Sequence, residues 1–154
     1  MKISSPIKRA EWLKPVSREH HHGLLLCWKI KTGLQKEIDP TRIKSYTDWF
    51  YETYLVPHFK LEEETIFTIL GEENKLIKQA TAEHLVLHEL FNTDEHLQFT
   101  LELIKLGLEN HIRFEERVLF KEIQKVATPE QIKAFAELES KQVFEENMDD
   151  PFWE

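Results

Sequence analysis

The sequence predicts an all-α protein, an antiparallel up-and-down four-helix bundle with an additional C-terminal helix. Apolar residues recur every three or four positions rather than alternating as they would in half-buried strands. Only four glycines and six prolines interrupt the 154 residues, so long helices are expected. Because short connections separate the predicted helices, neighbours should run antiparallel and share one core.

The length fits one domain over residues 1–154, with a core large enough to fold without disulfides. Within it, we expect the four-helix bundle to occupy residues 17–126, and the C-terminal helix and tail to occupy residues 128–154. We find no internal repeat and no low-complexity segment that would suggest another division.

The first helix is expected over about 17–37, with Ser17 as its N-cap ahead of the apolar run LLLCWKIKTGL. Asp39 should cap the second helix, over about 40–70. Pro40 then occupies its first turn, where the missing N–H has no partner to lose.

Pro57 falls inside the second helix, where it removes a backbone donor, so a kink or a break is expected one turn ahead of the pair His58 and Glu62. Gly71 should end this helix. The third helix follows over about 74–91, and the fourth extends over about 94–126 after a turn.

Thr128, Pro129 and Gln131 form a capping-box pattern that predicts the start of the fifth helix. Its apolar side should consist of Ile132, Phe135, Leu138 and Val143. The acidic end of the chain should either fray or dock through two aromatic residues, Phe152 and Trp153.

The charge and the single cysteine narrow the possible partners and compartments. With 28 acidic and 20 basic residues, the formal charge of −8 argues against non-specific binding to the phosphate backbone of nucleic acid. Cys27 cannot form an internal disulfide, which favours a reducing compartment, and we expect the cytoplasm. We see no signal peptide and no apolar run that could span a membrane. The sequence does not indicate an oligomeric state.

Two stretches place a histidine four residues before a glutamate: HFKLEEETIF from His58 and HIRFEERVLF from His111. Residues four apart lie about 40° apart around an α-helix, so His58 and Glu62 share a face, as do His111 and Glu115. This is the apolar face of each helix, which the fourth helix continues with Ile104, Leu108 and Val118.

The first and third helices also direct imidazoles inward. His84 and His88 are four residues apart on the apolar stripe of the third helix. The first helix carries three consecutive histidines, of which only one can point fully inward. We choose His20, which shares a stripe with Cys27, and His21 is the alternative.

Seven polar side chains are thus expected in the core: His20, His58, Glu62, His84, His88, His111 and Glu115. A buried carboxylate is costly unless it is paired or bound to a metal. Five imidazoles and two carboxylates exceed the ligands of one tetrahedral zinc ion. Two six-coordinate ions bridged by the carboxylates would use every group and leave an open position, and iron is the natural candidate.

Other polar residues are expected to have no role in the site. Glu63, Glu64 and Glu116 should form solvated faces, and His96 is well out of phase with His111. Cys27 should simply fill space in the core.

The stretches SREHHH, HFKLEEETIF, EHLVLH and HIRFEERVLF follow one another between Ser17 and Phe120. With them the chain resembles the hemerythrin-like, or HHE cation-binding, family. The resemblance implies a four-helix bundle that holds a non-haem di-iron centre bridged by two carboxylates, with the same seven residues as ligands. The resemblance does not cover the last helix.

The family contains two spacings for the last carboxylate. Oxygen-carrying hemerythrins place it five residues after its histidine, which would select Glu116, whereas many bacterial relatives place it four residues after, which selects Glu115. We choose Glu115 because it stays in phase, and Glu116 is the alternative. The pair His84 and His88 matches oxygen-binding hemerythrins. The cysteine-bearing N-terminal segment of relatives that repair iron-sulfur centres is missing from this sequence.

Three functions are therefore considered. The first is a di-iron protein that binds or senses O2 or NO. The second is an enzyme that consumes peroxide or NO, or an iron donor for repair of iron-sulfur centres, which we rank lower because no extra acid, base or redox cysteine accompanies the site. The third is a structural metal-binding or iron-storage module, for which a ferritin-like site would need two Glu-x-x-His motifs. Only Glu19-x-x-His22 is present. We expect a binding protein rather than a dedicated enzyme.

Overall fold

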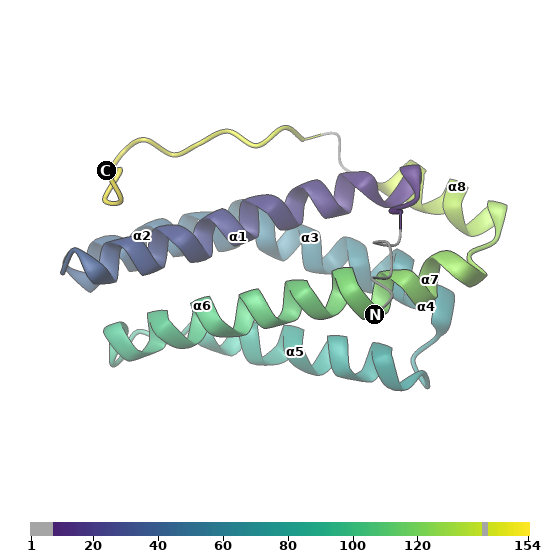
Figure 1. Ribbon diagram of the computed structural model, residues 1–154, viewed down its shortest axis with the longest axis horizontal. Coiled ribbons are helices and arrows are strands. Elements are labelled where there is room, and N and C mark those ends of the chain that lie inside the picture. The colour runs from purple at the N-terminus through teal and green to yellow at the C-terminus, as the bar shows by residue number, and fades with distance from the viewer. Residues whose placement is uncertain (1–7, 140–141) are drawn as a thin grey trace, which may run out of the picture.

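The computed structural model describes residues 8–139 and 142–154 (Figure 1). In chain order its elements are η1 (Glu11–Leu13), α1 (Lys14–Gln35), α2 (Pro40–Phe50), η2 (Tyr51–Leu55), α3 (Val56–Leu61), η3 (Glu62–Ile66), α4 (Phe67–Leu70), α5 (Lys75–Phe91), α6 (Leu97–Phe114), η4 (Glu115–Leu119), α7 (Phe120–Val126) and α8 (Pro129–Leu138). The described residues contain no strand, which confirms the all-α class.

Most helix ends follow the capping signals of the sequence. The Asp39 carboxylate accepts the backbone N–H of Thr41 at the start of α2. Thr128 and Gln131 form the predicted capping box at the start of α8. Gly71 ends α4 with a positive φ of 87°, a left-handed conformation that strains any residue with a Cβ.

Two helix starts differ from the prediction. The first helix begins at Lys14 rather than at Ser17, because Pro15 fits the first helical turn. Ser17 therefore lies inside α1, where its hydroxyl donates to Glu116. The fourth long helix begins at Leu97, since His96 has a φ of 49° and interrupts helical winding.

Three π-helical turns interrupt the α-helical winding. The first, η2, ends one residue before the Val56–Pro57 step, so the expected kink or break takes the form of a wide turn in a segment that stays helical to Leu70. The other two, η3 and η4, begin at Glu62 and Glu115.

The turn that starts at Glu115 also corrects the predicted apolar stripe. A π-turn holds an extra residue, so the inward position after Glu115 moves from residue 118 to residue 119. Val118 is accordingly 40% exposed, whereas Leu119 is fully buried.

The helices enclose two apolar clusters. α1 packs against α6, α6 packs against α5, α2 contacts both α1 and α6, and α4 contacts α7. One cluster contains Leu26, Ile30, Phe50, Leu55, Leu87 and Leu108. The other contains Leu13, Val16, Ile66, Phe67, Leu119 and Phe120. Buried polar residues of the candidate site lie in sequence between residues of the two clusters: His20, Glu62, His84 and Glu115.

The end of the chain docks along α1 (Figure 1). Phe152 is 1% exposed and lies over Gly33, where a Cβ would come within 2.7 Å of the phenyl ring. The buried Lys29 ammonium donates to Tyr46 and Glu146 and lies 4.1 Å from the centre of the Trp153 ring. Of the two expected outcomes, docking is therefore the one observed.

The fifth helix is shorter than expected. α8 ends at Leu138, and its apolar side reduces largely to Phe135, which is fully buried. Leu138 and Val143 are 61% and 77% exposed, and Val143 lies beyond α8, so the predicted apolar side does not extend to these two residues. Residues 1–7 and 140–141, which fall in the predicted domain and C-terminal helix, lie outside the described part.

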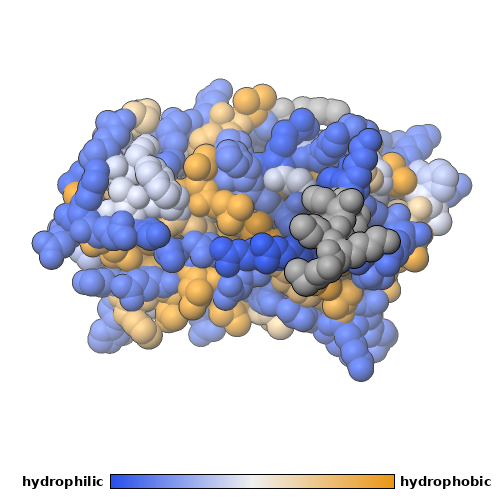
Figure 2. Space-filling model, viewed as in Figure 1, coloured by the Kyte–Doolittle hydropathy of each residue, from blue (hydrophilic) through white to orange (hydrophobic). Residues whose placement is uncertain are grey.

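The surface is largely hydrophilic, but apolar side chains gather across the middle of the face that carries α1 and α6 (Figure 2). Exposed apolar residues on these two helices include Leu24, Trp28 and Leu106. Within the described ranges, none of the helices is both long enough and apolar enough to cross a lipid bilayer.

Candidate metal centre

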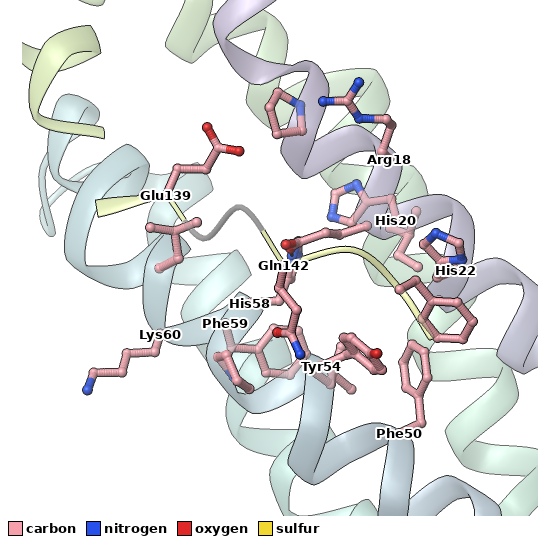
Figure 3. A pocket seen from close by; sticks show the side chains of 18 of the residues that line it. Arg18, His20, His22, Phe50, Tyr54, His58, Phe59, Lys60, Glu139 and Gln142 are labelled. Atoms are coloured by element: carbon pink, nitrogen blue, oxygen red, sulfur yellow. Dashed lines mark hydrogen bonds and ion pairs between the residues drawn. The ribbon is translucent and has the colours of Figure 1, made fainter. Parts of the chain in front are cut away.

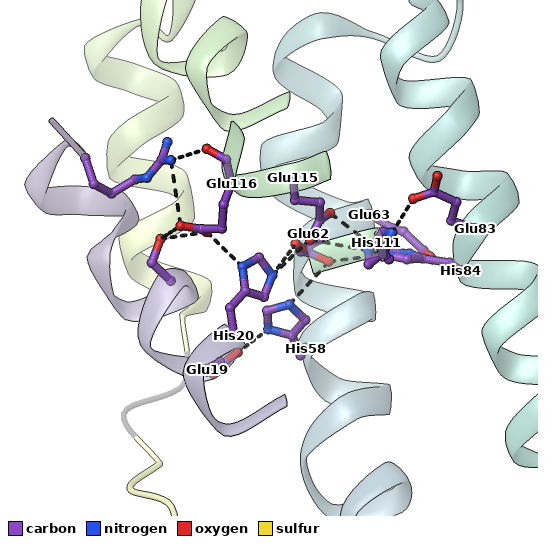
Figure 4. Close-up of polar contacts among 12 residues, drawn as sticks. Glu19, His20, His58, Glu62, Glu63, Glu83, His84, His111, Glu115 and Glu116 are labelled. Atoms are coloured by element: carbon purple, nitrogen blue, oxygen red, sulfur yellow. Dashed lines mark hydrogen bonds and ion pairs between the residues drawn. The ribbon is translucent and has the colours of Figure 1, made fainter. Parts of the chain in front are cut away.

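Six of the seven predicted side chains meet in the interior between the two apolar clusters (Figure 4). They form two groups that share both carboxylates. His20 and His58 complete the first group, His84 and His111 complete the second, and Glu62 and Glu115 belong to both. Within each group the potential ligand atoms lie within 4.8 Å of one another, so each group could hold a metal ion.

The distances fit ions placed between the donors. His20 Nε2 lies 2.9 Å from one Glu115 oxygen, and His84 Nε2 lies 3.2 Å from one Glu62 oxygen. His84 Nε2 and His111 Nε2 are 3.1 Å apart. Two donors bound at about 2.1 Å to one ion and at right angles would be separated by about 3 Å. The groups thus have the spacing of a coordination shell.

The inward-facing atoms have only one another as partners. Both oxygens of Glu62 and of Glu115, together with the Nε2 atoms of His20 and His58, are buried and make no hydrogen bond among the described residues. Both glutamates are 0% exposed. Such a set of unsatisfied acceptors would be strongly destabilising in a dry core, and bound cations would satisfy it.

Each of the four histidines also binds a second carboxylate on its outer side. The Nδ1–H of His20 donates to Glu116 at 2.8 Å, and that of His84 donates to Glu63 at 2.6 Å. An Nδ1–H that is donated outward leaves the Nε2 lone pair directed inward, which is the tautomer that a metal requires. These contacts correct the expectation that Glu63 and Glu116 have no role in the site. Glu63 and Glu64 are exposed as predicted, whereas Glu116 is half-buried.

The other two outer carboxylates come from residues that received no role in the sequence analysis of the site. Glu19 accepts the Nδ1–H of His58, and Glu83 accepts that of His111 at 2.7 Å. The four outer glutamates sit next in sequence to a group member: Glu19 beside His20, Glu63 beside Glu62, Glu83 beside His84 and Glu116 beside Glu115. Each of them nevertheless binds a histidine of another helix. Adjacency in the sequence could therefore have indicated that these glutamates lie near the site, but not which histidine each of them binds.

Stacking fixes two of the imidazole planes. The ring of Phe59 stacks on His84 with centroids 3.9 Å apart, and the ring of Phe120 stacks on His20 at 5.4 Å. Rotation about χ2 is therefore opposed by an aromatic neighbour as well as by the outer carboxylate. The Nε2 atoms are held in place before any ion binds.

Without an ion, protons are the cations that compensate the carboxylates. Burial alone would lower the pKa of His58, but the Glu62 carboxylate outweighs it and raises the pKa to about 9. Burial also opposes the charge of His111, but Glu115 raises its pKa to about 10. Burial would raise the pKa of Glu62, but His58 and the other imidazoles hold it well below its ordinary value. A metal ion would have to displace these protons.

The remaining candidates lie outside both groups. His88 Nδ1 is 2.5 Å from the Tyr51 hydroxyl, and His88 belongs to neither group, so six of the seven predicted ligands come together. His21 is exposed, whereas its neighbour His20 is 4% exposed. Cys27 is buried and its thiol contacts the Lys105 carbonyl, which agrees with a space-filling role.

The chain matches no family model, no curated protein and no solved structure. Its chemistry is therefore inferred from the arrangement of its own residues. The donors are only imidazole and carboxylate, and among the described residues no thiol enters either group. Such a set favours a divalent cation of intermediate hardness over a soft cation held by thiolates.

Proposed function

We propose that this protein is a hemerythrin-like, non-haem di-iron protein that binds O2 or NO at the centre of an antiparallel four-helix bundle. The observation that carries the proposal is the pair of buried groups, each with two imidazoles and with two carboxylates in common. Two ions held in this way would share Glu62 and Glu115 as bridges. The four motifs that resemble the HHE family supply all six residues.

The donor count leaves room for a small ligand. Two imidazoles and two shared carboxylates give each ion four protein donors, so two positions of a six-coordinate ion stay free. Iron would supply the redox-active site at which O2 or NO binds. The protein supplies the positions of the donors, their tautomers and a dry environment.

Electrostatics supports cations at this position. Two carboxylates lie inside the site, and Glu19, Glu63, Glu83 and Glu116 surround it through the four histidines. Among the described residues, the Lys or Arg side chain that forms a salt bridge with these glutamates is Arg9, at 3.7 Å from Glu116. Six negative charges around a buried site favour two divalent ions over one.

The test is anaerobic reconstitution of the purified protein with Fe(II), followed by metal analysis and absorption spectra before and after exposure to O2 or NO. We expect two irons per chain and a new visible absorption with either gas. Glu62→Gln should reduce the iron content, whereas Glu64→Gln, two residues further on and exposed, should not. A reconstituted protein that binds no iron, or that binds it equally well after Glu62→Gln, would overturn the proposal. Two bound irons that leave the spectra unchanged with both gases would limit the centre to a structural role.

A further inference from the structure

A pocket of about 650 Å³ opens beside the first metal group (Figure 3). Its walls come from α1, α3, α6 and residues 142–144 beyond α8. His20, His58 and His111 line it, so the pocket reaches the candidate centre itself. A molecule bound here would lie against the imidazoles of both groups.

The volume is far larger than a diatomic ligand requires. A water molecule occupies about 30 Å³ in the liquid, so the pocket corresponds to about twenty waters, and a diatomic gas is of similar size to one water. Pockets of roughly 300–1,000 Å³ are typical of sites that enclose organic molecules. The space beside the centre thus has the size of an organic ligand site.

The lining is mainly apolar. The wall carries Phe50, Tyr54, Leu55, Phe59, Leu108 and Ile112. Phe144 adds a further wall and is held by stacking on His22, with ring centroids 4.2 Å apart. At the rim, Leu138 and Val143 expose most of their apolar surface to solvent. An apolar molecule in the pocket would cover all three of these side chains.

The charges around the pocket do not select a charged ligand. Arg18 and Lys60 lie on opposite walls (Figure 3), and neither makes a salt bridge within the described part of the chain. They are balanced by the carboxylates of Glu19, Glu64 and Glu139, of which Glu19 already binds His58. Two positive and two uncommitted negative groups leave the pocket close to neutral.

We propose that this pocket binds an uncharged organic molecule with an apolar body, seated between α1 and α3 against the metal centre. The inference deepens the proposed function, on which it rests for the role of the ligand, since it names the class of molecule that shares the centre with the small gas. The apolar body packs on the aromatic wall and excludes water from the imidazoles.

The test uses three probes with the same ten-carbon chain: 1-decanol, decanoate and decyltrimethylammonium. Binding to the full-length protein is measured by calorimetry, as purified and again after anaerobic loading with Fe(II). We expect saturable binding of one 1-decanol per chain in both preparations, at least 10-fold tighter than that of either charged probe. Preferential binding of a charged probe, or no saturable binding of 1-decanol, would overturn the proposal.

Matched variants locate the binding. The double change Leu138→Asp and Val143→Asp places charges at the exposed rim and should weaken 1-decanol binding about 10-fold or more. The control Leu106→Asp and Val126→Asp changes the same residue types at exposed positions outside the pocket, and should change binding less than 2-fold. Equal losses in both pairs would indicate surface adsorption and refute the site. Because the protein as purified is also tested, a failure of iron or gas binding does not decide this result.

Discussion

Removing one outer carboxylate should weaken one metal site and spare the other. Glu83 hydrogen-bonds to one of the six group members, His111, which belongs to the second group, and its other hydrogen bond comes from Gln79 outside the site. Its loss leaves the Nδ1–H of a 1% exposed imidazole without its acceptor, so the ring is free to turn and the inward tautomer is no longer fixed. His20 and His58 keep their own acceptors, Glu116 and Glu19.

The size of the effect follows from the 2.7 Å bond between His111 and Glu83. Loss of an outer partner costs about 10–100-fold in metal affinity. Glu83→Ala should therefore weaken the second site about 30-fold, which corresponds to roughly 2 kcal/mol. Glu83→Gln retains an acceptor but loses the charge, and a charge-assisted hydrogen bond is about twice as strong as a neutral one, so it should weaken the site about 5-fold.

The assay is calorimetric titration of the metal-free protein with Zn(II), which probes both sites without redox chemistry. We expect two binding steps, of which only one shifts in the Glu83 variants. Glu89→Ala, an exposed glutamate on the same helix, is the control and should shift neither step. Equal weakening of both steps, or an equal effect of the control, would refute the assignment of Glu83 to one site.

Three further predictions concern the rest of the chain. Phe152→Ala should lower the free energy of unfolding by about 3 kcal/mol in urea titrations. The control Met148→Ala, at an exposed position, should leave it unchanged. Equal free energies of unfolding for the two variants would contradict docking of the tail. Burial would raise the pKa of Glu146, but the Lys29 ammonium holds this pKa below the ordinary 4.5. The ionised carboxylate therefore stabilises the docked tail fully above pH 4.5. This stabilisation is lost as the pH falls through the lowered pKa. Limited proteolysis should then release the tail faster in acid, and Glu146→Gln should remove that dependence on pH. Burial raises the pKa of the Cys27 thiol to about 12, so a thiol reagent should modify it only when the protein unfolds, and rapid labelling of the native protein would refute this.

Helical periodicity was sufficient to predict which histidines and glutamates face the interior. His58 and Glu62 lie four residues apart on an apolar stripe, and that spacing determines their face without knowledge of any other helix. The same reasoning placed His88 inward. Periodicity could not predict the hydrogen bond between the Tyr51 hydroxyl and Nδ1 of His88, because that contact depends on how two helices pack.

The outer glutamates could not be assigned from the sequence for the same reason. Glu116 is one residue past Glu115, a phase that usually indicates a solvated position, and it reaches His20 only because α1 lies beside η4. The π-turns are likewise invisible to a 3.6-residue period, so Val118 was assigned to the core in place of Leu119.

The sharing of Glu62 and Glu115 has a consequence for how the chain holds together. Residues up to Gly71 contribute His20, His58 and Glu62, and residues beyond it contribute His84, His111 and Glu115, so neither half owns a complete set of donors. An ion in either position would bind donors from both halves and so hold the two halves together. If the backbone were cut in the exposed connection after Gly71, the two halves should dissociate less readily in the metal-filled protein than in the metal-free protein, where only the apolar clusters hold them together.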